Sequence, residues 1–396
     1  MAVRFGSWHV GWLKSFLLGA ALSSALGFAA PQATSVPSAR QSTASAPRVN
    51  VTAHGISYAY ATSNELPHGV AGDHRLVFIA VPLTPEVRVL DRFTGRTLAT
   101  LPAPPGGFIL PFALRVPRDG RLVVLDAGGF PSPFVVSVPR VYDYDYQFNP
   151  RTGVFTASVV RTVGFAGLPI VFTEDVEVLS DSLYVVSESI VGALWLIQAN
   201  GSVVPGIVPS NPAVPLPQLG PCPFPTVDVG GIPFGIGFGP GVGSLASRDG
   251  QLYFKSTCLG GVYRVPVATL TDASRTPDAR AADIRTVSAP VPGGPDVLEG
   301  LVFNRFNPRD RYLYAGDPLR LRLVRIDPET GSRQVVGDDP LLFNFSVALA
   351  FLPPVFGLSP LVVVSDQEYR FAAFNPALTQ DVFQLPFIIT KVYPFP

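Results

Sequence analysis

The segment Glu299–Asp317, EGLVFNRFNPRDRYLYAGD, contains the unit that decides the fold. A short apolar strand follows an acid and a glycine, a charged turn comes next, and a stronger strand begins with Leu-Tyr. The unit recurs loosely in five other stretches: HGVAGDHRLVFIAVP from His68, FALRVPRDGRLVVLDAG from Phe112, EDVEVLSDSLYVVSES from Glu174, FGIGFGPGVGSLASRDGQLYFKSTC from Phe234 and SVALAFLPPVFGLSPLVVVSD from Ser346. The six copies begin roughly 45 to 65 residues apart, a spacing typical of propeller blades.

A third strand follows the central pair in most copies, as in LWLIQANGS, GGVYRVPVA and LRLVRIDPETGS. Alternating apolar residues and a turn with Gly or Asn mark each as part of a hairpin. We therefore predict an all-β, six-bladed β-propeller. A β-sandwich or two small barrels would not explain a unit that recurs along almost the whole chain. The segment Arg48–Thr62, RVNVTAHGISYAYAT, precedes the first copy, and we expect it to close the last blade beside FQLPFIITKVYPF, because such closure removes exposed sheet edges.

Composition excludes several classes of function. The 396 residues carry 29 Lys and Arg against 29 Asp and Glu, so there is no positive excess to attract nucleic acid or an anionic membrane. Hydrophobic residues make up 47%, enough for a large core. The 42 Pro and 37 Gly make long helices improbable. Gly-x-Ser-x-Gly and His-Glu-x-x-His motifs are absent from the sequence.

The N-terminus has the features of a secretory signal peptide. Arg4 and Lys14 precede the apolar run SFLLGAALSSALGFAA, which is followed by small residues. We assign residues 1–33 to the signal, 34–47 to a flexible linker and 48–396 to the propeller. A secreted or periplasmic monomer without a membrane anchor is expected. An organellar transit peptide, and hence an organellar lumen, is the alternative, because no acidic residue precedes Glu65.

The two cysteines, Cys222 and Cys258, are expected to form a disulfide in an exported chain. Such a bridge would pin the Pro-rich segment Val203–Gly231 to the fourth unit. The apolar side chains of this segment argue against a freely solvated linker, and long loops in compact domains are often lids. We expect an apolar roof over the axial mouth, suited to a hydrophobic small molecule more than to a sugar.

Four stretches, LPHGVAGDHRLVFIA, GGVYRVPVATL, PGGPDVLEGLVFN and RLVRIDPETGSRQVV, resemble the regucalcin/gluconolactonase-like six-bladed propellers, whose relatives include strictosidine-synthase-like proteins. The resemblance covers most of residues 60–370. It implies a divalent cation, usually calcium, on the central axis, held by a Glu, an Asn and an Asp at the inner ends of blades. That cation would activate water to open a lactone or related ester.

The residues just before the inner strands converge on the axis of a propeller. Here they are His68, Glu174 or Asp175, Phe234, and Glu299 with Asp296 nearby. Compared with the family, His68 stands where Glu is expected, Phe234 where Asn is frequent, and Glu299 where Asp is usual. Glu299, Glu174 and Asp175 are the predicted metal ligands, for calcium before zinc. Glu299, Glu174 and His68 are the predicted catalytic set, which alternatively holds a transition metal or acts without metal as an acid–base pair.

Two classes of function follow from the sequence. The first is a secreted lactonase- or esterase-like hydrolase that acts on a small, apolar molecule at the axial carboxylates, with or without a divalent cation. The second is a non-catalytic propeller that binds a small molecule or a protein partner. The departures from the family's metal motif favour the second class, and a fold by itself does not settle activity.

Overall fold

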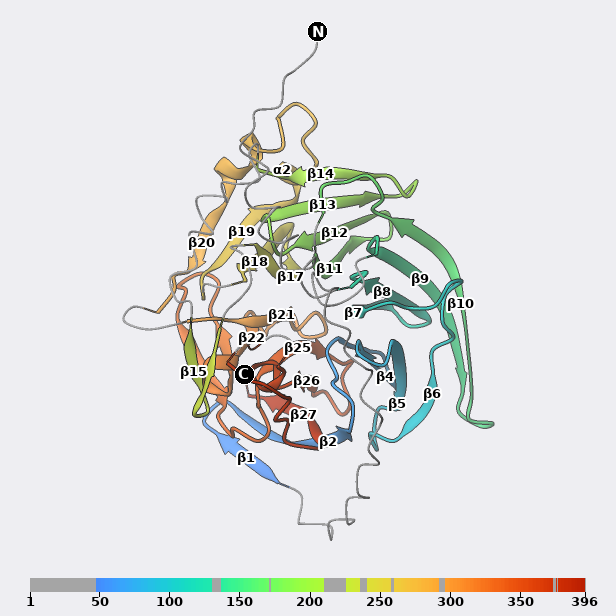
Figure 1. Cartoon of the computed structure of the whole chain (residues 1–396), viewed down its shortest axis with the longest axis vertical. Coiled ribbons are helices and arrows are strands. Elements are labelled where there is room, and N and C mark those ends of the chain that lie inside the picture. Colours follow the sequence, from blue (N-terminus) through green and yellow to red (C-terminus); the bar gives the residue numbers. More distant parts are fainter. Residues whose placement is uncertain are drawn as a thin grey trace, which may run out of the picture. The chain divides into compact units, whose positions relative to one another are not determined.

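In a computed structural model of the chain, the described residues form six antiparallel sheets of four or five strands arranged around a centre, and a separate two-stranded hairpin (Figure 1). The structure describes residues 48–129, 137–170, 172–209, 226–235, 241–257, 260–291, 296–372, 375 and 377–395. The first strands of the six sheets contact one another in sequence, and β25 contacts β3, so that the inner strands form a closed ring. The six-bladed propeller predicted from the repeat is therefore confirmed.

In the first five blades the four strands follow chain order from the centre outwards. Blade one contains β3 (Val70–Gly72), β4 (Leu76–Val81), β5 (Glu86–Asp91) and β6 (Thr97–Thr100). Blade two contains β7 (Pro111–Arg118), β8 (Arg121–Asp126), β9 (Arg140–Asn149) and β10 (Val154–Gly164). Blade three contains β11 (Thr173–Ser180), β12 (Leu183–Glu188), β13 (Ala193–Gln198) and β14 (Val203–Ile207). Blade four contains β17 (Val242–Arg248), β18 (Gln251–Ser256), β19 (Val262–Pro266) and β20 (Arg285–Ser288). Blade five contains β21 (Glu299–Phe303), β22 (Leu313–Asp317), β23 (Arg322–Ile326) and β24 (Arg333–Gly337). The second sheet has the order β10-β9-β8-β7, which is the same arrangement counted from the outside.

The sixth sheet has five strands in the order β1-β2-β27-β26-β25. It combines β25 (Ser346–Phe351), β26 (Leu361–Ser365) and β27 (Phe387–Pro394) with β1 (Val49–Thr52) and β2 (Gly55–Ser63). Strand β2 runs antiparallel to β27, with Gly55 opposite Pro394 and Ser63 opposite Phe387. The segment Arg48–Thr62 thus forms a hairpin rather than one strand. How much this pairing stabilises the ring stays a prediction.

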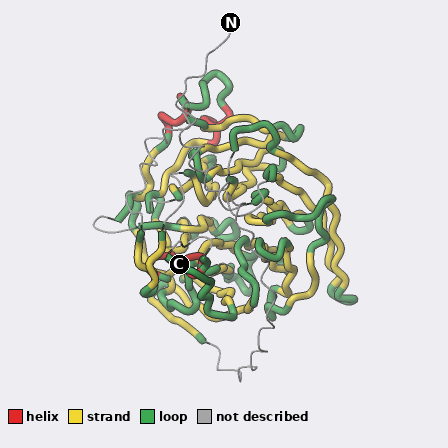
Figure 2. Tube along the Cα trace, viewed as in Figure 1, coloured by secondary structure: helices red, strands yellow, loops and turns green. Residues whose placement is uncertain are grey.

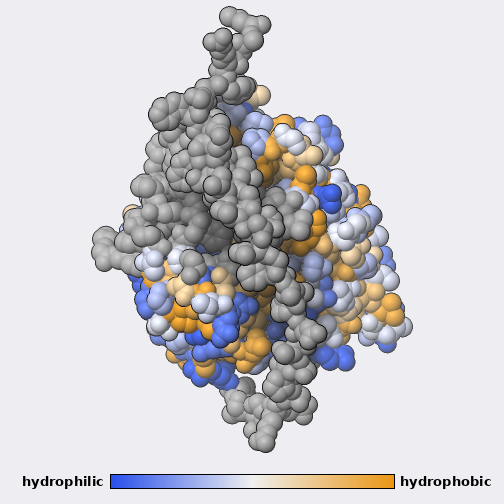
Figure 3. All heavy atoms as spheres, viewed as in Figure 1, coloured by the Kyte–Doolittle hydropathy of each residue, from blue (hydrophilic) through white to orange (hydrophobic). Residues whose placement is uncertain are grey.

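The core lies between neighbouring blades. All six residues of β4 are buried, because each blade packs against a neighbour on both faces. The second strand of a blade is therefore a nearly continuous apolar run, as in β4. The outer strand β10 instead alternates exposed and partly buried residues. Strands make up most of the regular structure in Figure 2. On the face seen in Figure 3, the described residues interleave hydrophilic and hydrophobic side chains.

The helices in the part of the chain that the structure describes are short: α2 (Val267–Thr271) and the 3₁₀ turns η2 (Ala279–Asp283), η3 (Pro318–Arg320) and η4 (Glu368–Arg370). Within the described ranges, no helix has the length and apolar character needed to cross a membrane. The predicted signal peptide and linker, residues 1–47, lie outside the described residues, as do Cys222 and Cys258. Their assignments stay predictions.

One unit begins later than the sequence predicts. Phe234 was expected at the mouth of the fourth inner strand, but it ends β16 (Ile232–Phe234), which pairs with β15 (Val227–Val229) in a separate hairpin. Its ring packs edge-on against Phe345, with ring centroids 5.5 Å apart, inside a buried cluster next to the sixth blade. The inner strand of blade four is β17. Phe234 is therefore a core residue of the inserted hairpin and does not replace a ligand on the axis.

Candidate functional site

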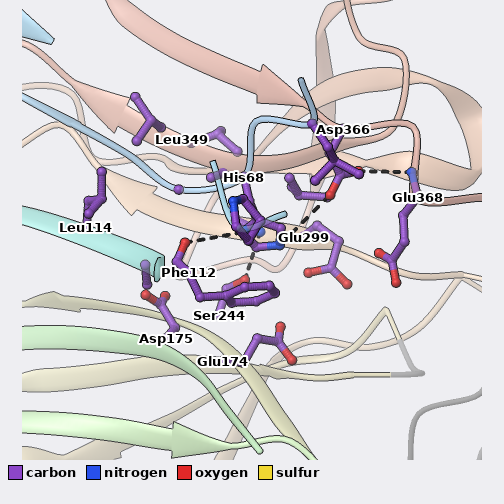
Figure 4. A pocket seen from close by; sticks show the side chains of 18 of the residues that line it. His68, Phe112, Leu114, Glu174, Asp175, Ser244, Glu299, Leu349, Asp366 and Glu368 are labelled. Atoms are coloured by element: carbon purple, nitrogen blue, oxygen red, sulfur yellow. Dashed lines mark hydrogen bonds and ion pairs between the residues drawn. The ribbon is translucent and has the colours of Figure 1, made fainter. Parts of the chain in front are cut away.

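A cavity lies where the inner strands converge. Its apolar wall includes Leu66, Leu83, Phe112, Phe172 and Phe371. Its polar residues are His68, Glu174, Asp175, Ser244, Glu299, Asp366 and Glu368, together with Arg115 and Thr257. Figure 4 shows Glu174, Glu299 and Glu368 with their carboxylates turned toward a common space.

The structure brings together four of the residues that the sequence analysis placed at the inner strand ends, namely His68, Glu174, Asp175 and Glu299, but neither Phe234 nor Asp296. His68 lies just before β3, Glu174 and Asp175 lie in β11, and Glu299 begins β21, so they come from three different blades. Gly300 has a φ of 58°, and a Cβ there would lie 2.5 Å from Leu349 Cδ1 and 2.7 Å from the carbonyl oxygen of Val347. Only glycine fits this close approach, which places Glu299 at the cavity.

Lys255 is a site residue that the sequence analysis missed. It lies on β18, its side chain is 0% exposed, and its Nζ is 2.6 Å from Glu299 Oε1 and 3.5 Å from Glu174 Oε1. Burial alone lowers the pKa of Lys255, but the charges of Glu174 and Glu299 and their hydrogen bonds outweigh burial and raise it. Lys255 is therefore an ammonium ion that bridges two carboxylates.

A second pair of acids, Asp366 and Glu368, follows β26 in the sixth blade and was also missed. The backbone N–H of Glu368 donates a hydrogen bond of 3.0 Å to Asp366 Oδ1. Burial raises the pKa of both groups well above the ordinary value. The charge of Glu299 adds to the rise for Asp366, and the charges of Asp366, Glu299 and Glu174 add to it for Glu368. The raised pKa values of Asp366 and Glu368 favour the protonated, uncharged form of both side chains in the cavity.

His68 forms part of the wall in its neutral state. Its ring stacks on Phe112 with centroids 3.6 Å apart, and Nδ1 lies 3.3 Å from the carbonyl oxygen of Phe112. Burial lowers the pKa of His68 to about 3, an effect that this carbonyl opposes and that the charge of Lys255 reinforces. With Nδ1–H donating to the carbonyl, the lone pair of Nε2 faces Asp366 Oδ2, 3.9 Å away.

Asp175 points away from the shared space of the other acids. Its Oδ2 accepts hydrogen bonds of 2.8 Å from Arg115 Nη2 and from the backbone N–H of Leu245, so it joins the second, third and fourth blades. Burial raises the pKa of Asp175 to about 6 against the lowering effect of Arg115. Asp296 does not line the cavity at all, because it is buried between Arg333 and Arg320.

The described residues do not fit the divalent-cation site that the family resemblance implies. None of their His, Cys, Asp and Glu side chains form a group of three or more arranged to hold a metal ion. A calcium ion needs six to eight oxygen ligands within about 2.3–2.6 Å. Between Glu174 and Glu299, where such an ion would find its carboxylates, lies the ammonium group of Lys255.

Comparisons with known proteins agree on the fold. No known family profile matches the sequence, and a search of curated proteins finds no relative. A protein of unknown function from Bacteroides thetaiotaomicron superposes with a TM-score of 0.53 at 13% identity, over 87% of this chain and 76% of that one. A luciferin-regenerating enzyme superposes with a TM-score of 0.51 at 12% identity, over 88% of this chain and 95% of that one. A gluconolactonase from Xanthomonas campestris superposes with a TM-score of 0.49 at 11% identity, over 89% of this chain and 96% of that one. At these identities the likeness shows the propeller fold alone.

Proposed function

We propose that the protein is a secreted hydrolase that opens a lactone or cleaves an ester of a small, apolar molecule in the axial cavity. The observation that carries this proposal is the carboxylate of Glu299, which is held by the buried ammonium of Lys255 and faces an apolar-walled cavity. A carboxylate fixed in this way has the geometry of a general base. The likeness to solved propellers, a luciferin-regenerating enzyme among them, supports the fold on which the proposal rests.

In the proposed reaction Glu299 takes a proton from a water molecule as the water oxygen attacks the carbonyl carbon. The bond from that carbon to the ester oxygen then breaks, and the proton passes from Glu299 to the leaving oxygen, so that an acid and an alcohol result. Burial raises the pKa of Glu299 to about 7, against the lowering effect of Lys255, which keeps both of its protonation states accessible at neutral pH. Ser244 Oγ accepts the N–H of Gly300 at 2.8 Å, which leaves its own hydrogen to donate to the oxyanion.

The cavity also sets the class of substrate. Phe112, Phe172 and Phe371 supply aromatic surface that excludes water and favours apolar groups. Glu174 and Glu299 already share the ammonium of Lys255, and Asp366 and Glu368 add no positive charge, so the cavity disfavours an anionic substrate. We therefore expect neutral, apolar esters or lactones to be better substrates than sugar acids.

The test is a panel of neutral lactones and esters of increasing apolar size, assayed with the wild type and with Glu299→Gln. We expect the substitution to lower kcat by about 10²–10⁴-fold, the usual contribution of a general base. Wild-type turnover should rise with pH through about 7, because the deprotonated form of Glu299 is the active one. Glu329→Gln is the matched control, since Glu329 is 68% exposed in a distant turn and its loss should leave kcat unchanged.

Tight binding of a panel compound without turnover would instead support the non-catalytic propeller. Turnover that is equal in the wild type and Glu299→Gln would refute the role of Glu299. Export is part of the proposal and rests on residues 1–33, which the structure does not describe. N-terminal sequencing of the protein recovered outside the cytoplasm checks it, and a mature chain that still begins at Met1 would contradict it.

A further inference from the structure

We infer that Lys255 is a built-in cation that takes the place of a divalent metal ion on the propeller axis, so that the axial site is assembled and stable without metal. This inference deepens the proposed function, because it identifies what neutralises the site in which that reaction would occur. It does not require turnover, since it concerns the charge balance of the folded protein.

The first argument is the path of the lysine side chain. Lys255 belongs to β18, the second strand of its blade, and its side chain must cross the inner strand β17 to reach the axis. The pairing of β17 with β18 is irregular between Val242 and Leu245, which is where Gly243 and Ser244 lie. This bulge opens the inner strand at the point where the lysine crosses it.

Gly243 makes the crossing possible. A Cβ at Gly243 would lie 2.5 Å from Lys255 Nζ and 2.6 Å from Glu174 Oε1, and closer still to Lys255 Cε. Any side chain at this position would therefore overlap both the ammonium and one of its carboxylates. The site thus contains a passage fitted to a lysine.

The lysine is not a packing requirement of the blade. The Leu-Tyr strands β12 and β22 align with β18, and the residues that match Lys255 there are Val186 and Gly316. Leu252 and Phe254 on β18 are buried apolar residues, as the pattern requires. A buried ammonium is expensive unless charged partners offset the loss of hydration, so the presence of Lys255 points to a requirement for positive charge at the axis.

The acidic side chains that line the cavity explain why positive charge is required at the axis. Glu174, Glu299, Asp366 and Glu368 all line the same cavity, and each would repel the others if nothing neutralised them. Lys255 Nζ contacts two of them and is completely buried, so it cannot swing out to admit a metal ion at the same place. The geometry therefore makes a lysine and a divalent ion between Glu174 and Glu299 mutually exclusive.

The test combines metal analysis with thermal unfolding of the full chain in calcium chloride, manganese chloride or EDTA. We expect less than stoichiometric divalent metal in the wild type and the same melting temperature in all three conditions. Lys255→Met removes the ammonium and keeps most of the side-chain volume. We expect it to melt lower in EDTA and to gain at least about 5 °C when a divalent ion binds the freed carboxylates. Lys391→Met is the control, because Lys391 is also buried but donates to the carbonyl oxygen of Arg92, away from the cavity.

One divalent ion per wild-type chain, or a wild-type melting temperature that falls in EDTA, would overturn the inference. So would a Lys255→Met protein whose melting temperature ignores divalent ions. If Lys255→Met does not fold, metal analysis and calcium titration of the wild type alone decide the question. Absence of turnover with every ester and lactone would refute the proposed hydrolase yet leave a metal-independent wild type standing, so the two failures are distinguishable.

Discussion

Replacing Asp296 with asparagine tests whether this acid stabilises the fold or serves the cavity. The side chain is 1% exposed. Arg333 Nη1 donates to its two oxygens at 3.0 and 2.9 Å, Arg320 Nη1 to one of them at 3.3 Å, and the backbone N–H of Val291 to the other at 2.9 Å. An asparagine can accept with one oxygen only, and its amide would face at least one of these donors.

The cost follows from these contacts. Breaking a buried ion pair by removing one partner costs about 3–5 kcal/mol, because the remaining charge is left uncompensated. Arg320 is 34% exposed and can regain water, whereas Arg333 is 14% exposed and regains little. We therefore expect the free energy of unfolding to fall by about 3 kcal/mol, the low end of this range. If that free energy depends on urea with a slope of about 3 kcal/mol per molar, the urea midpoint falls by about 1 M.

The assay is urea unfolding followed by the fluorescence of Trp195, which is buried in the third blade. Asp249→Asn serves as the control, because Asp249 is 89% exposed and an exposed ion pair contributes at most about 1 kcal/mol. Under native conditions Asp296→Asn should retain the wild-type kcat. Loss of turnover at an unchanged midpoint would refute this reasoning and would place Asp296 in the site beside Glu299.

Two further predictions concern the ends and the cysteines of the chain. Deleting Arg48–Thr62 should cause aggregation by exposing the edge of β27, whereas deleting residues 1–40 should not; a soluble product with an unchanged melting temperature after the first deletion would contradict the role given to this pairing. Cys222 and Cys258 should be bridged in protein from its native compartment, with a contribution of about 3–4 kcal/mol, and two free thiols in the denatured, unreduced protein would show otherwise.

The propeller could be predicted because each blade is specified by residues that lie close together in the sequence. Each blade repeats a turn followed by a strand with Leu-Tyr or Leu-Val near its start, as in Leu183–Glu188 and Leu361–Ser365, and strands of this kind cannot bury both faces alone. Phe234 shows the limit of such patterns. Pro233-Phe234-Gly235 has the same local character as a unit start, and only the contacts of its ring with Phe345 assign it to the inserted hairpin.

The candidate site could be predicted in part. Glu174 and Glu299 reach the cavity because inner strands converge, which is a property of the fold. Strand alternation separates Glu174 from Asp175, but the sequence does not say which of two adjacent acids faces inwards. Lys255 could not be found in the same way, because it enters from the second strand through a bulge. A lysine within the apolar run of QLYFKS was the available signal.

The passage through β17 also has a consequence for how this chain can change over generations. Gly243 and Lys255 form an epistatic pair, since a lysine at 255 is tolerated only where residue 243 has no side chain. A lineage that loses the glycine first displaces the ammonium and leaves the acids without their counter-charge, so that route is closed by loss of stability. A lineage that loses the lysine first leaves the glycine harmless and the acids free to recruit an ion from outside. The order of substitutions, rather than their number, therefore decides whether descendants of this protein depend on metal.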